Sequence, residues 1–324
     1  MNVKPVPGIE KIAVLGAGTM GPGIAQTYAM GGYAVYLWTR EETAFELDKA
    51  KETLQSSLTT FVEEGVLTRE EADATYARIH YVTDLAEAVR DAQYIQETIV
   101  ERANIKAALY EQLRSLISPT AILASNTSAL NIFEVVPADL LPQQIIAHWY
   151  APPQLIPLVE VVKSEQAPQA FADTAVAILE SCGKTAVLMK KFIQGYIINR
   201  LQQCIQGECF ALIDGGYCDA QAIDDACKAS FIPRAMVLGI CKRIDFGGVD
   251  MTANNIKNKS YSFPSYDTMP KCMQEHLDKN ELGVKTGKGF YDYTGRDKAE
   301  MFAHRDKQLF EAFRLAKKFM DDPV

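Results

Sequence analysis

The sequence predicts an α/β protein in which a doubly wound sheet is followed by an all-helical domain. Short apolar runs alternate with helical segments through the first half of the chain, and a glycine-rich turn directly follows the first run. Beyond residue 189 the alternation stops and helical patterns dominate. Because strand–helix alternation forms sheets with helices on both faces, we expect a sheet domain at residues 1–189 and a helical domain at residues 190–324.

Composition excludes several classes of protein. The 324 residues are 48% hydrophobic and 23% charged, which is ordinary for a globular chain. A formal net charge of −8 argues against general nucleic-acid binding, because phosphate backbones are held by excess Lys and Arg. No run approaches the roughly 18 apolar residues of a membrane span. The first ten residues lack the apolar core of a signal peptide, so we expect a cytoplasmic protein.

Cysteine usage points in the same direction. The chain has seven cysteines, an odd number, and no pair is spaced as CxxC. We expect reduced, mostly buried thiols, as in a cytoplasmic protein, and no metal centre.

The stretch "KIAVLGAGTMG" carries the pattern of a phosphate-binding turn. A buried strand ends at Gly16, which permits the tight turn, Gly18 lets backbone N–H groups approach a pyrophosphate, and Gly21 lets the next helix pack closely. That helix directs the positive end of its dipole toward the phosphates. The pattern predicts a Rossmann-type dinucleotide site, with Thr19 and Met20 also in the binding loop.

The end of the second strand bears on which dinucleotide binds. An NAD site usually has Asp or Glu there, which accepts hydrogen bonds from the ribose hydroxyls. This chain has Thr39 followed by Arg40. Thr39 would not repel the 2′-phosphate of NADP and Arg40 could pair with it, so the pattern favours acceptance of NADP. If Arg40 is instead solvated or covers the adenine, NAD still binds, so both cofactors stay open.

The remaining segments complete the expected architecture. Residues 43–80 read as two helices separated at "GVLT", the second with a capping box formed by Thr68 and Glu71. In the helical domain, "YIINRLQQCIQGECFALIDGG" predicts a long helix ended by glycines, and Asp219 is expected to cap the next. The further strands of a parallel sheet are expected at "AQYIQETIV", "AILASNTS", "QIIAHWY", "IPLVEVV" and "KTAVLMK".

His148 is the strongest candidate for acid–base chemistry. The other histidines, His80, His276 and His304, lie in polar segments that read as helical, where surface positions are expected. His148 ends a predicted strand, where open α/β sheets place their ligands. Glu160 lies in the apolar run "PLVEVV", where a carboxylate needs a partner, and an imidazole would leave its other nitrogen free to take a hydroxyl proton. A Glu160 satisfied by backbone beside an exposed His148 fits the spacing equally well.

Several motifs taken together resemble one family. They are "GAGTMGPGIAQTYA", "ETIVERANIK", "ASNTSAL", "HWYAPPQLIPLVEVV", "GYIINRL" and "GVKTGKGFYDY". Their order and spacing resemble the L-3-hydroxyacyl-CoA dehydrogenases, with relatives such as L-gulonate 3-dehydrogenase and carnitine dehydrogenase, over nearly the whole chain. The resemblance is specific for the superfamily and leaves the substrate undetermined.

The resemblance implies a role for each candidate residue. His148 would be the general base in alcohol oxidation and the general acid in ketone reduction, with Glu160 orienting it. Ser128 and Asn199 would hydrogen-bond the substrate near the reacting carbon and the nicotinamide. The expected cofactor contacts outside the glycine loop are Glu101, Lys106 and Asn126. The resemblance also implies NAD as cofactor, a small-molecule substrate and a homodimer formed through the helical domain.

Two departures from the family pattern leave the substrate open. The family usually has Asn three residues after the catalytic histidine, and this chain has Ala151. The expected hairpin between Lys51 and His80 carries three Lys or Arg against six Asp or Glu, whereas a cationic arm would suit CoA. A 3-hydroxyacyl-CoA is the first substrate class expected, and a free 3-hydroxy acid or similar small polar alcohol is the second. A nucleotide-binding protein without turnover is a third interpretation, disfavoured because the candidate catalytic residues occur together.

Overall fold

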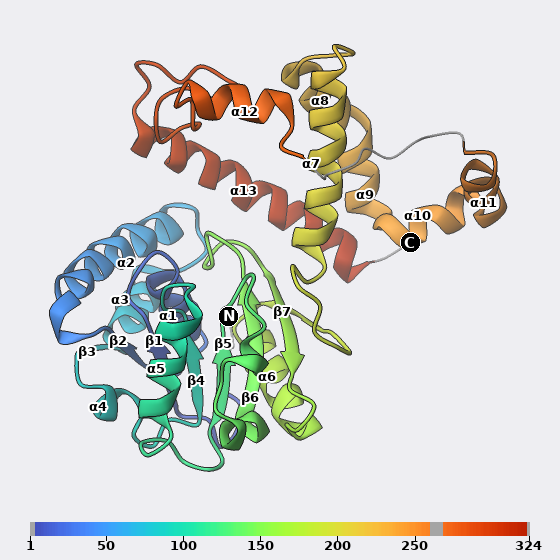
Figure 1. The fold of residues 1–324 in the computed structure, drawn as a ribbon. Coiled ribbons are helices and arrows are strands. Elements are labelled where there is room, and N and C mark those ends of the chain that lie inside the picture. The colour runs from blue at the N-terminus through green and yellow to red at the C-terminus, as the bar shows by residue number, and fades with distance from the viewer. Residues whose placement is uncertain (1–3, 260–267, 323–324) are drawn as a thin grey trace. The chain divides into compact units, whose positions relative to one another are not determined.

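The computed structural model describes residues 4–259 and 268–322 and divides into two compact units, Met1–Ile197 and Ile198–Val324. The first unit is an α/β sheet domain and the second is helical (Figure 1), so the predicted fold class is confirmed. The first unit extends past residue 189, where the sequence placed the boundary. Tyr196 is buried within it and donates a hydrogen bond to the carbonyl of Thr127, which ties this segment to the sheet.

The sheet sets the position of every candidate residue in the first unit. Its strands are β1 (Lys11–Leu15), β2 (Ala34–Trp38), β3 (Ile79–Val82), β4 (Tyr94–Glu97), β5 (Ile122–Ser125), β6 (Gln144–Trp149), β7 (Leu158–Lys163) and β8 (Thr185–Leu188). Their order is β3-β2-β1-β4-β5-β6-β7-β8, so the direction of growth reverses between β1 and β4. Ligands of open α/β sheets bind outside the carboxyl ends of the strands at such a reversal.

Strand β7 departs from the predicted parallel sheet. It pairs antiparallel with β6, and β8 is parallel to β7, whereas the pairs among β1 to β6 are all parallel. The cause is the length of the connection. Only residues 150–157 link β6 to β7, and a parallel return needs a crossover of about a dozen residues or more. The expectation of a wholly parallel sheet is therefore wrong at this edge.

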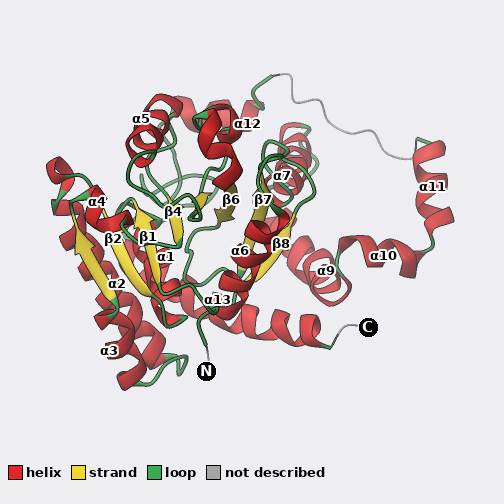
Figure 2. Ribbon diagram, turned by 90° about the horizontal axis from the view of Figure 1, so that it is seen from below, coloured by secondary structure: helices red, strands yellow, loops and turns green. Residues whose placement is uncertain are grey.

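Helices cover both faces of the sheet, and Figure 2 shows the yellow strands lying between them. One face carries α1 (Gly21–Met30), α2 (Phe45–Glu63), α3 (Arg69–Ala77) and α6 (Gln169–Ser181), and the other carries α4 (Leu85–Val89) and α5 (Ala103–Leu113). In β1, Ile12 and Val14 enter one apolar core while Ala13 and Leu15 enter the other. Unbroken apolar runs are typical of strands that are buried on both faces.

Short turns and the helical hairpin complete the first unit. The 3₁₀ turns are Glu41–Thr43, Ile132–Glu134 and Ala138–Gln143. Between α2 and α3 the helical pattern breaks where expected, and the predicted capping box is confirmed. The amide of Glu71 donates to the Thr68 hydroxyl over 3.1 Å, and the amide of Thr68 donates to the Glu71 carboxylate over 2.8 Å.

The second unit is mainly helical in its described residues, with a turn-rich segment between α12 and α13 that holds two isolated β-bridges, Gly283 with Lys288 and Lys288 with Asp292. Asp219 caps α8 as predicted, because its carboxylate accepts a hydrogen bond from the amide of Ala222 over 2.8 Å. The helices are α7 (Ile198–Asp214), α8 (Ala220–Ala226), a π-helical turn (Cys227–Phe231), α9 (Ile232–Leu238), α10 (Ile240–Gly247), α11 (Val249–Lys257), α12 (Lys271–Asp278) and α13 (Lys298–Asp321).

Two sequence expectations need correction here. His80 does not lie in a helix: it is an exposed residue of β3, and its ring stacks on Tyr36 with the centroids 4.7 Å apart. The seven cysteines are free, but only Cys272 is buried, since most of the others lie on helices of the second unit with large exposed faces. In the described part of the chain, no helix is both long and apolar enough to cross a membrane.

Candidate active site

The glycine loop follows β1 at the carboxyl edge of the sheet. Gly16 has a φ of +121°, and a Cβ there would lie 2.7 Å from the carbonyl oxygen of Thr98 on the neighbouring strand connection. A Cβ on Gly21 would overlap the carbonyl oxygen of Gly16. Both glycines are therefore required, since a side chain at Gly16 would collide with the backbone of Thr98 in an unfavourable conformation, and one at Gly21 would push the helix away from the glycine turn.

Gly18 differs from its two neighbours because a Cβ built on it would meet nothing within 4 Å. Gly18 and Thr19 are exposed and Met20 is half-buried, so the loop presents its backbone to open space. The first turn of α1 directs unpaired N–H groups to the same place. An open backbone cradle at a helix N-terminus fits the pyrophosphate of a dinucleotide.

The strand end after β2 differs in detail from the expectation. Thr39 is buried, and its hydroxyl contacts the Glu46 carboxylate over 3.0 Å and the Thr43 hydroxyl over 2.7 Å. Arg40 is exposed. The strand end lacks an acid of its own, but the Glu46 carboxylate from the first turn of α2 lies beside it. Sequence spacing from the strand does not show it.

His148 and Glu160 are brought together by the β6–β7 hairpin. The two residues are directly opposed in the antiparallel register. The Nδ1 atom of His148 lies 3.0 Å from Oε2 of Glu160, and both side chains are buried, at 2% and 0% exposure. The expected partner of the buried carboxylate is thus the histidine. The alternative of an exposed strand-end histidine does not fit this geometry.

Glu160 has further donors that the sequence interpretation missed. The hydroxyl of Tyr150 donates to Oε2 over 2.7 Å, and the amide of Ile197 donates to Oε1 over 2.9 Å. Tyr150 lies two residues after His148, so strand alternation places both on one side. That periodicity is the sequence signal that could have indicated Tyr150.

The other ring nitrogen of His148 faces Ser128. Its Nε2 atom lies 3.2 Å from the hydroxyl oxygen of Ser128, which is exposed on the loop after β5. On its other sides the imidazole stacks on Tyr196, with centroids 4.5 Å apart, and meets the edge of Tyr150. Burial, with the negative charges of Glu101 and Glu160, raises the pKa of Tyr196. Tyr196 is therefore a neutral packing surface that fixes the plane of the ring.

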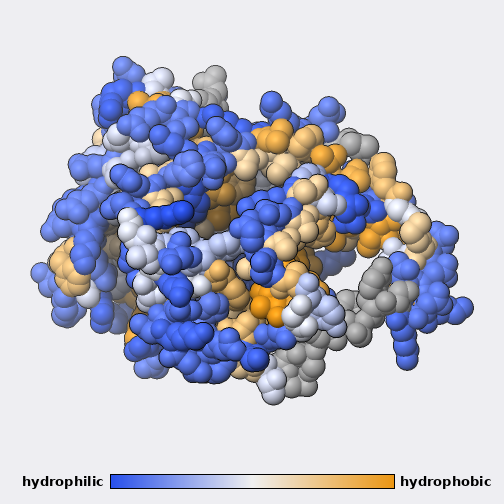
Figure 3. Space-filling view, turned by 90° about the horizontal axis from the view of Figure 1, so that it is seen from above, coloured by the Kyte–Doolittle hydropathy of each residue, from blue (hydrophilic) through white to orange (hydrophobic). Residues whose placement is uncertain are grey.

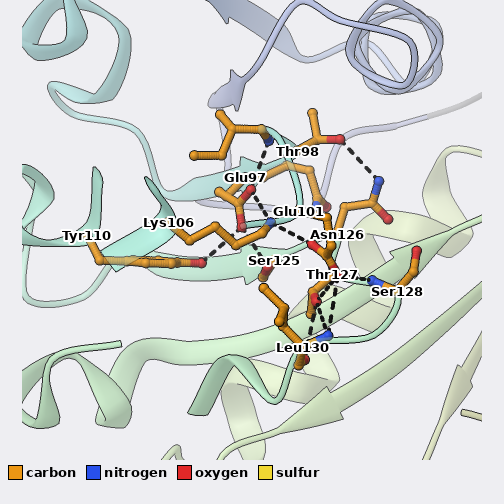
Figure 4. Close-up of polar contacts among 12 residues, drawn as sticks. Glu97, Thr98, Glu101, Lys106, Tyr110, Ser125, Asn126, Thr127, Ser128 and Leu130 are labelled. Carbon is orange, nitrogen blue, oxygen red and sulfur yellow. Dashed lines mark hydrogen bonds and ion pairs between the residues drawn. The ribbon is translucent and has the colours of Figure 1, made fainter. Parts of the chain in front are cut away.

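Glu101 anchors the loop that carries Ser128. Its Oε1 atom accepts hydrogen bonds from the Thr127 hydroxyl and from the amides of Ser128 and Ala129, at 2.6, 2.8 and 3.0 Å (Figure 4). Partial burial acts to raise the pKa of Glu101, but these donors and the ammonium of Lys106 outweigh it and lower the pKa. Glu101 thus remains ionised and holds the Ser128 hydroxyl in place.

Lys106 is placed differently from the expected cofactor contact. Its side chain is 0% exposed, and its ammonium lies 2.6 Å from Glu97 and 3.2 Å from Glu101. The buried Glu97 carboxylate also accepts from Ser125 and Tyr110, as Figure 4 shows. Any effect of Lys106 on a ligand therefore passes through Glu101. Sequence reasoning missed Glu97, because nothing local marks this strand residue as a charged anchor.

The two remaining candidates lie in different units. Asn126 connects three strand ends, because its amide donates to the Thr98 hydroxyl over 3.1 Å and its oxygen accepts from the amide of Trp149 over 2.8 Å. Asn199 lies in the first turn of α7, in the helical unit. Ala151 is exposed immediately after Tyr150. Within the described residues no group of three His, Cys, Asp or Glu side chains is placed to hold a metal ion.

A dinucleotide cradle and a buried His–Glu pair, both carried by one doubly wound sheet, are typical of a nucleotide-dependent oxidoreductase. The family model for 3-hydroxyacyl-CoA dehydrogenase, NAD binding domain, matches residues 11–192, and that for the C-terminal domain matches residues 195–293. The chain belongs to the 3-hydroxyacyl-CoA dehydrogenase family, and its first unit is an NAD-binding domain.

Individual relatives extend over nearly the whole chain. A probable 3-hydroxybutyryl-CoA dehydrogenase of Deinococcus radiodurans is 32% identical over 87% of this chain and 100% of its own. A 5-formyl-3-hydroxy-2-methylpyridine 4-carboxylate 5-dehydrogenase of Mesorhizobium japonicum is 28% identical over 95% of this chain and 98% of its own. A crystal structure of an enzyme of that second name, an NAD+-dependent dismutase, has a TM-score of 0.85 at 25% identity, covering 95% of this chain and 99% of that one.

The glycine loop gives a test that separates binding from folding. We expect Gly18→Ala to leave the thermal unfolding midpoint unchanged and to weaken NADH binding about tenfold or more, because only the ligand needs that space. Gly21→Ala should instead lower the free energy of unfolding by about 1–3 kcal/mol, because its Cβ overlaps the backbone of Gly16. Fluorescence titration with NADH and thermal unfolding measure both. Unchanged NADH affinity in Gly18→Ala would show that the pyrophosphate binds elsewhere.

Proposed function

We propose that the protein interconverts a 3-hydroxyacyl-CoA and its 3-ketoacyl-CoA with NAD as cofactor. The observation that carries the proposal is the buried His148, held at Nδ1 by Glu160 with Nε2 directed to the exposed hydroxyl of Ser128. This arrangement supplies one positioned proton acceptor at the edge of the sheet where the dinucleotide cradle opens. Membership of the family supports the same reaction class.

The residues divide the proton chemistry between them. His148 takes the hydroxyl proton of the substrate at Nε2 during oxidation and returns it during reduction. The Glu160 carboxylate fixes the ring through Nδ1–H and stabilises the imidazolium that forms. Ser128 and Asn199 hydrogen-bond the substrate oxygen and nicotinamide region. When bound, NAD supplies the hydride acceptor.

Reduction of acetoacetyl-CoA by NADH tests this assignment. The native enzyme should turn over, and His148→Gln should lower the rate by about 10²–10⁴-fold while NADH binding is kept, because general acid–base help of that size is lost. His80→Gln is the matched control, since His80 lies on β3 away from the pair, and its rate should equal that of the native enzyme. Near-normal turnover in His148→Gln would refute the assignment of the acid–base group.

A substrate without CoA is the second candidate. Ala151 stands where the family usually has Asn, and the α2–α3 hairpin is rich in acids. The Mesorhizobium relative, which acts on a pyridine carboxylate by its name, matches across 95% of the chain. Two negative results together would favour this candidate: no turnover of acetoacetyl-CoA and no rise of the thermal unfolding midpoint with free CoA. A ligand that binds the native state specifically must stabilise the fold, so an unchanged midpoint would mean that CoA does not bind.

We infer that NAD is preferred over NADP because of Glu46. Its carboxylate, 3.0 Å from the Thr39 hydroxyl, occupies the region where a strand-end acid normally accepts from the ribose hydroxyls. A 2′-phosphate placed there would meet a negative charge. The exposed guanidinium of Arg40 acts in the opposite direction and supports acceptance of NADP as the alternative.

Two charge substitutions decide between these cofactors. We expect a higher kcat/KM for NADH than for NADPH in the native enzyme, and Glu46→Gln should shift that ratio toward NADPH by about tenfold, because one repulsion is removed. Glu42→Gln, an exposed neighbour, should leave the ratio unchanged. If NADPH is preferred and Arg40→Ala abolishes that preference, Arg40 rather than Glu46 sets the specificity.

The helical unit is the proposed dimer surface. Large apolar side chains are exposed on several of its helices, and Figure 3 shows orange apolar surface on the face viewed from above. Contiguous exposed apolar surface is typical of a protein interface. The residues are Ile205, Ile232, Val237, Ile240, Ile244, Phe246, Val249, Met251 and Ile256.

Light scattering of the purified protein tests the dimer. We expect a mass of twice the 35.9 kDa of one chain. Phe246→Glu should produce the monomer, because burying a charge at an apolar interface is unfavourable. Phe45→Glu is the control, since Phe45 is also more than half exposed but lies on the sheet unit. A native protein that is monomeric at micromolar concentration would contradict the proposal.

A further inference from the structure

Tyr150 and His148 share one oxygen atom of Glu160. The Tyr150 hydroxyl lies 2.7 Å from Oε2, and Nδ1 of His148 lies 3.0 Å from the same atom. The other carboxylate oxygen, Oε1, accepts from the amide of Ile197. The two rings also touch, with centroids 4.6 Å apart and planes at 62°. A buried carboxylate thus divides one oxygen between the acid–base histidine and a tyrosine hydroxyl.

This shared oxygen has a direct electrostatic consequence. A hydroxyl that donates to a carboxylate stabilises its negative charge and weakens it as an acceptor for other donors. The charge that Glu160 offers to a protonated imidazole is therefore smaller with the Tyr150 hydroxyl present than without it. Because the carboxylate and imidazole are tightly coupled, the effect belongs to proton uptake by the pair, whichever atom holds the proton.

We propose that Tyr150 is a positioning residue that limits proton uptake by the His148–Glu160 pair. The inference rests on the proposed function, in which His148 must be neutral to accept the substrate proton. By donating to Oε2, the Tyr150 hydroxyl lowers the proton affinity of the pair. The pair therefore stays deprotonated down to a lower pH than it would without this hydrogen bond. It also holds the carboxylate in the plane that meets Nδ1.

The other groups around the ring act differently from Tyr150. Tyr196 stacks on the imidazole, but its hydroxyl donates to the carbonyl of Thr127. Ser128 contacts Nε2, and Glu101 is bound by the loop amides and Lys106. The Lys184 ammonium lies 5.3 Å from the ring centroid of Trp149, the residue after His148. It donates hydrogen bonds to carbonyl oxygens of the 150–157 segment and not to Glu160. Of these side chains, Tyr150 is the one that donates to the carboxylate oxygen shared with His148.

Removal of the hydroxyl gives the first test. Tyr150→Phe keeps the ring against His148 and deletes one donor, so the acid limb of the pH profile of kcat/KM for alcohol oxidation should move up by about one unit. Tyr36→Phe is the matched control, because Tyr36 also packs on a histidine, His80, without a shared carboxylate. That variant should leave the limb in place. If Tyr150→Phe instead lowers kcat/KM by the same factor at all pH values, Tyr150 has only a structural role and the proposal is overturned.

A measurement independent of turnover separates this inference from the proposed function. NMR titration of labelled histidine follows His148, assigned by the signal missing in His148→Gln, and its midpoint should rise in Tyr150→Phe while that of His80 stays fixed. Replacement of Tyr150 by 3-fluorotyrosine, a stronger donor, should move the midpoint down. An NMR shift without a matching shift in the rate profile supports the role of Tyr150 and contradicts the proposed role of His148. Unchanged midpoints in both variants would refute the role of Tyr150.

Discussion

The antiparallel pairing of β6 with β7 is the constraint on which the site depends. Its register sets Glu160 opposite His148, and a shift by one residue would turn one of the two side chains to the other face. The short connection at residues 150–157 enforces that direction, since it cannot form a crossover. The same hairpin brings Tyr150 to the carboxylate. One backbone feature therefore assembles the proton-handling groups without any loop having to close over them.

Buried carboxylates hold the rest of the site together. Glu160 and Glu97 are both 0% exposed, and each is satisfied by several donors from different strands and helices. Breaking a buried pair by removing one partner costs about 3–5 kcal/mol, because the remaining charge stays desolvated. Glu97 fixes Lys106, Lys106 fixes Glu101, and Glu101 holds the amides of the Ser128 loop. The exposed Ser128 hydroxyl is thereby positioned by a charged network that lies mostly below the surface.

Local features of the site could be predicted from the sequence, and features that depend on register could not. The glycine turn and the Thr68 capping box are defined within a few residues, so their patterns were sufficient. The need of a buried carboxylate for a partner made His148 one candidate for Glu160, but the spacing left a backbone-satisfied Glu160 equally open, and the antiparallel register of β6 and β7 decides for the histidine. The periodicity that places Tyr150 near His148 is visible in the sequence, but its contact with Glu160 requires knowing that β7 runs antiparallel. Glu46 was missed because α2 brings it back to the end of β2.

Lys184 connects the same hairpin to the outer edge of the sheet. It lies just before β8, and its ammonium donates to the carbonyl of Ile156 over 2.9 Å in the segment that follows His148. Burial lowers the pKa of Lys184 from 10.5 to about 7. Between these two pKa values the lysine is protonated in the unfolded chain and neutral in the folded one. The free energy of unfolding therefore rises with pH across this window. The connection that carries Tyr150 and Ala151 is thus fastened by a desolvated amine, and the hairpin that organises the site carries an electrostatic cost near neutral pH.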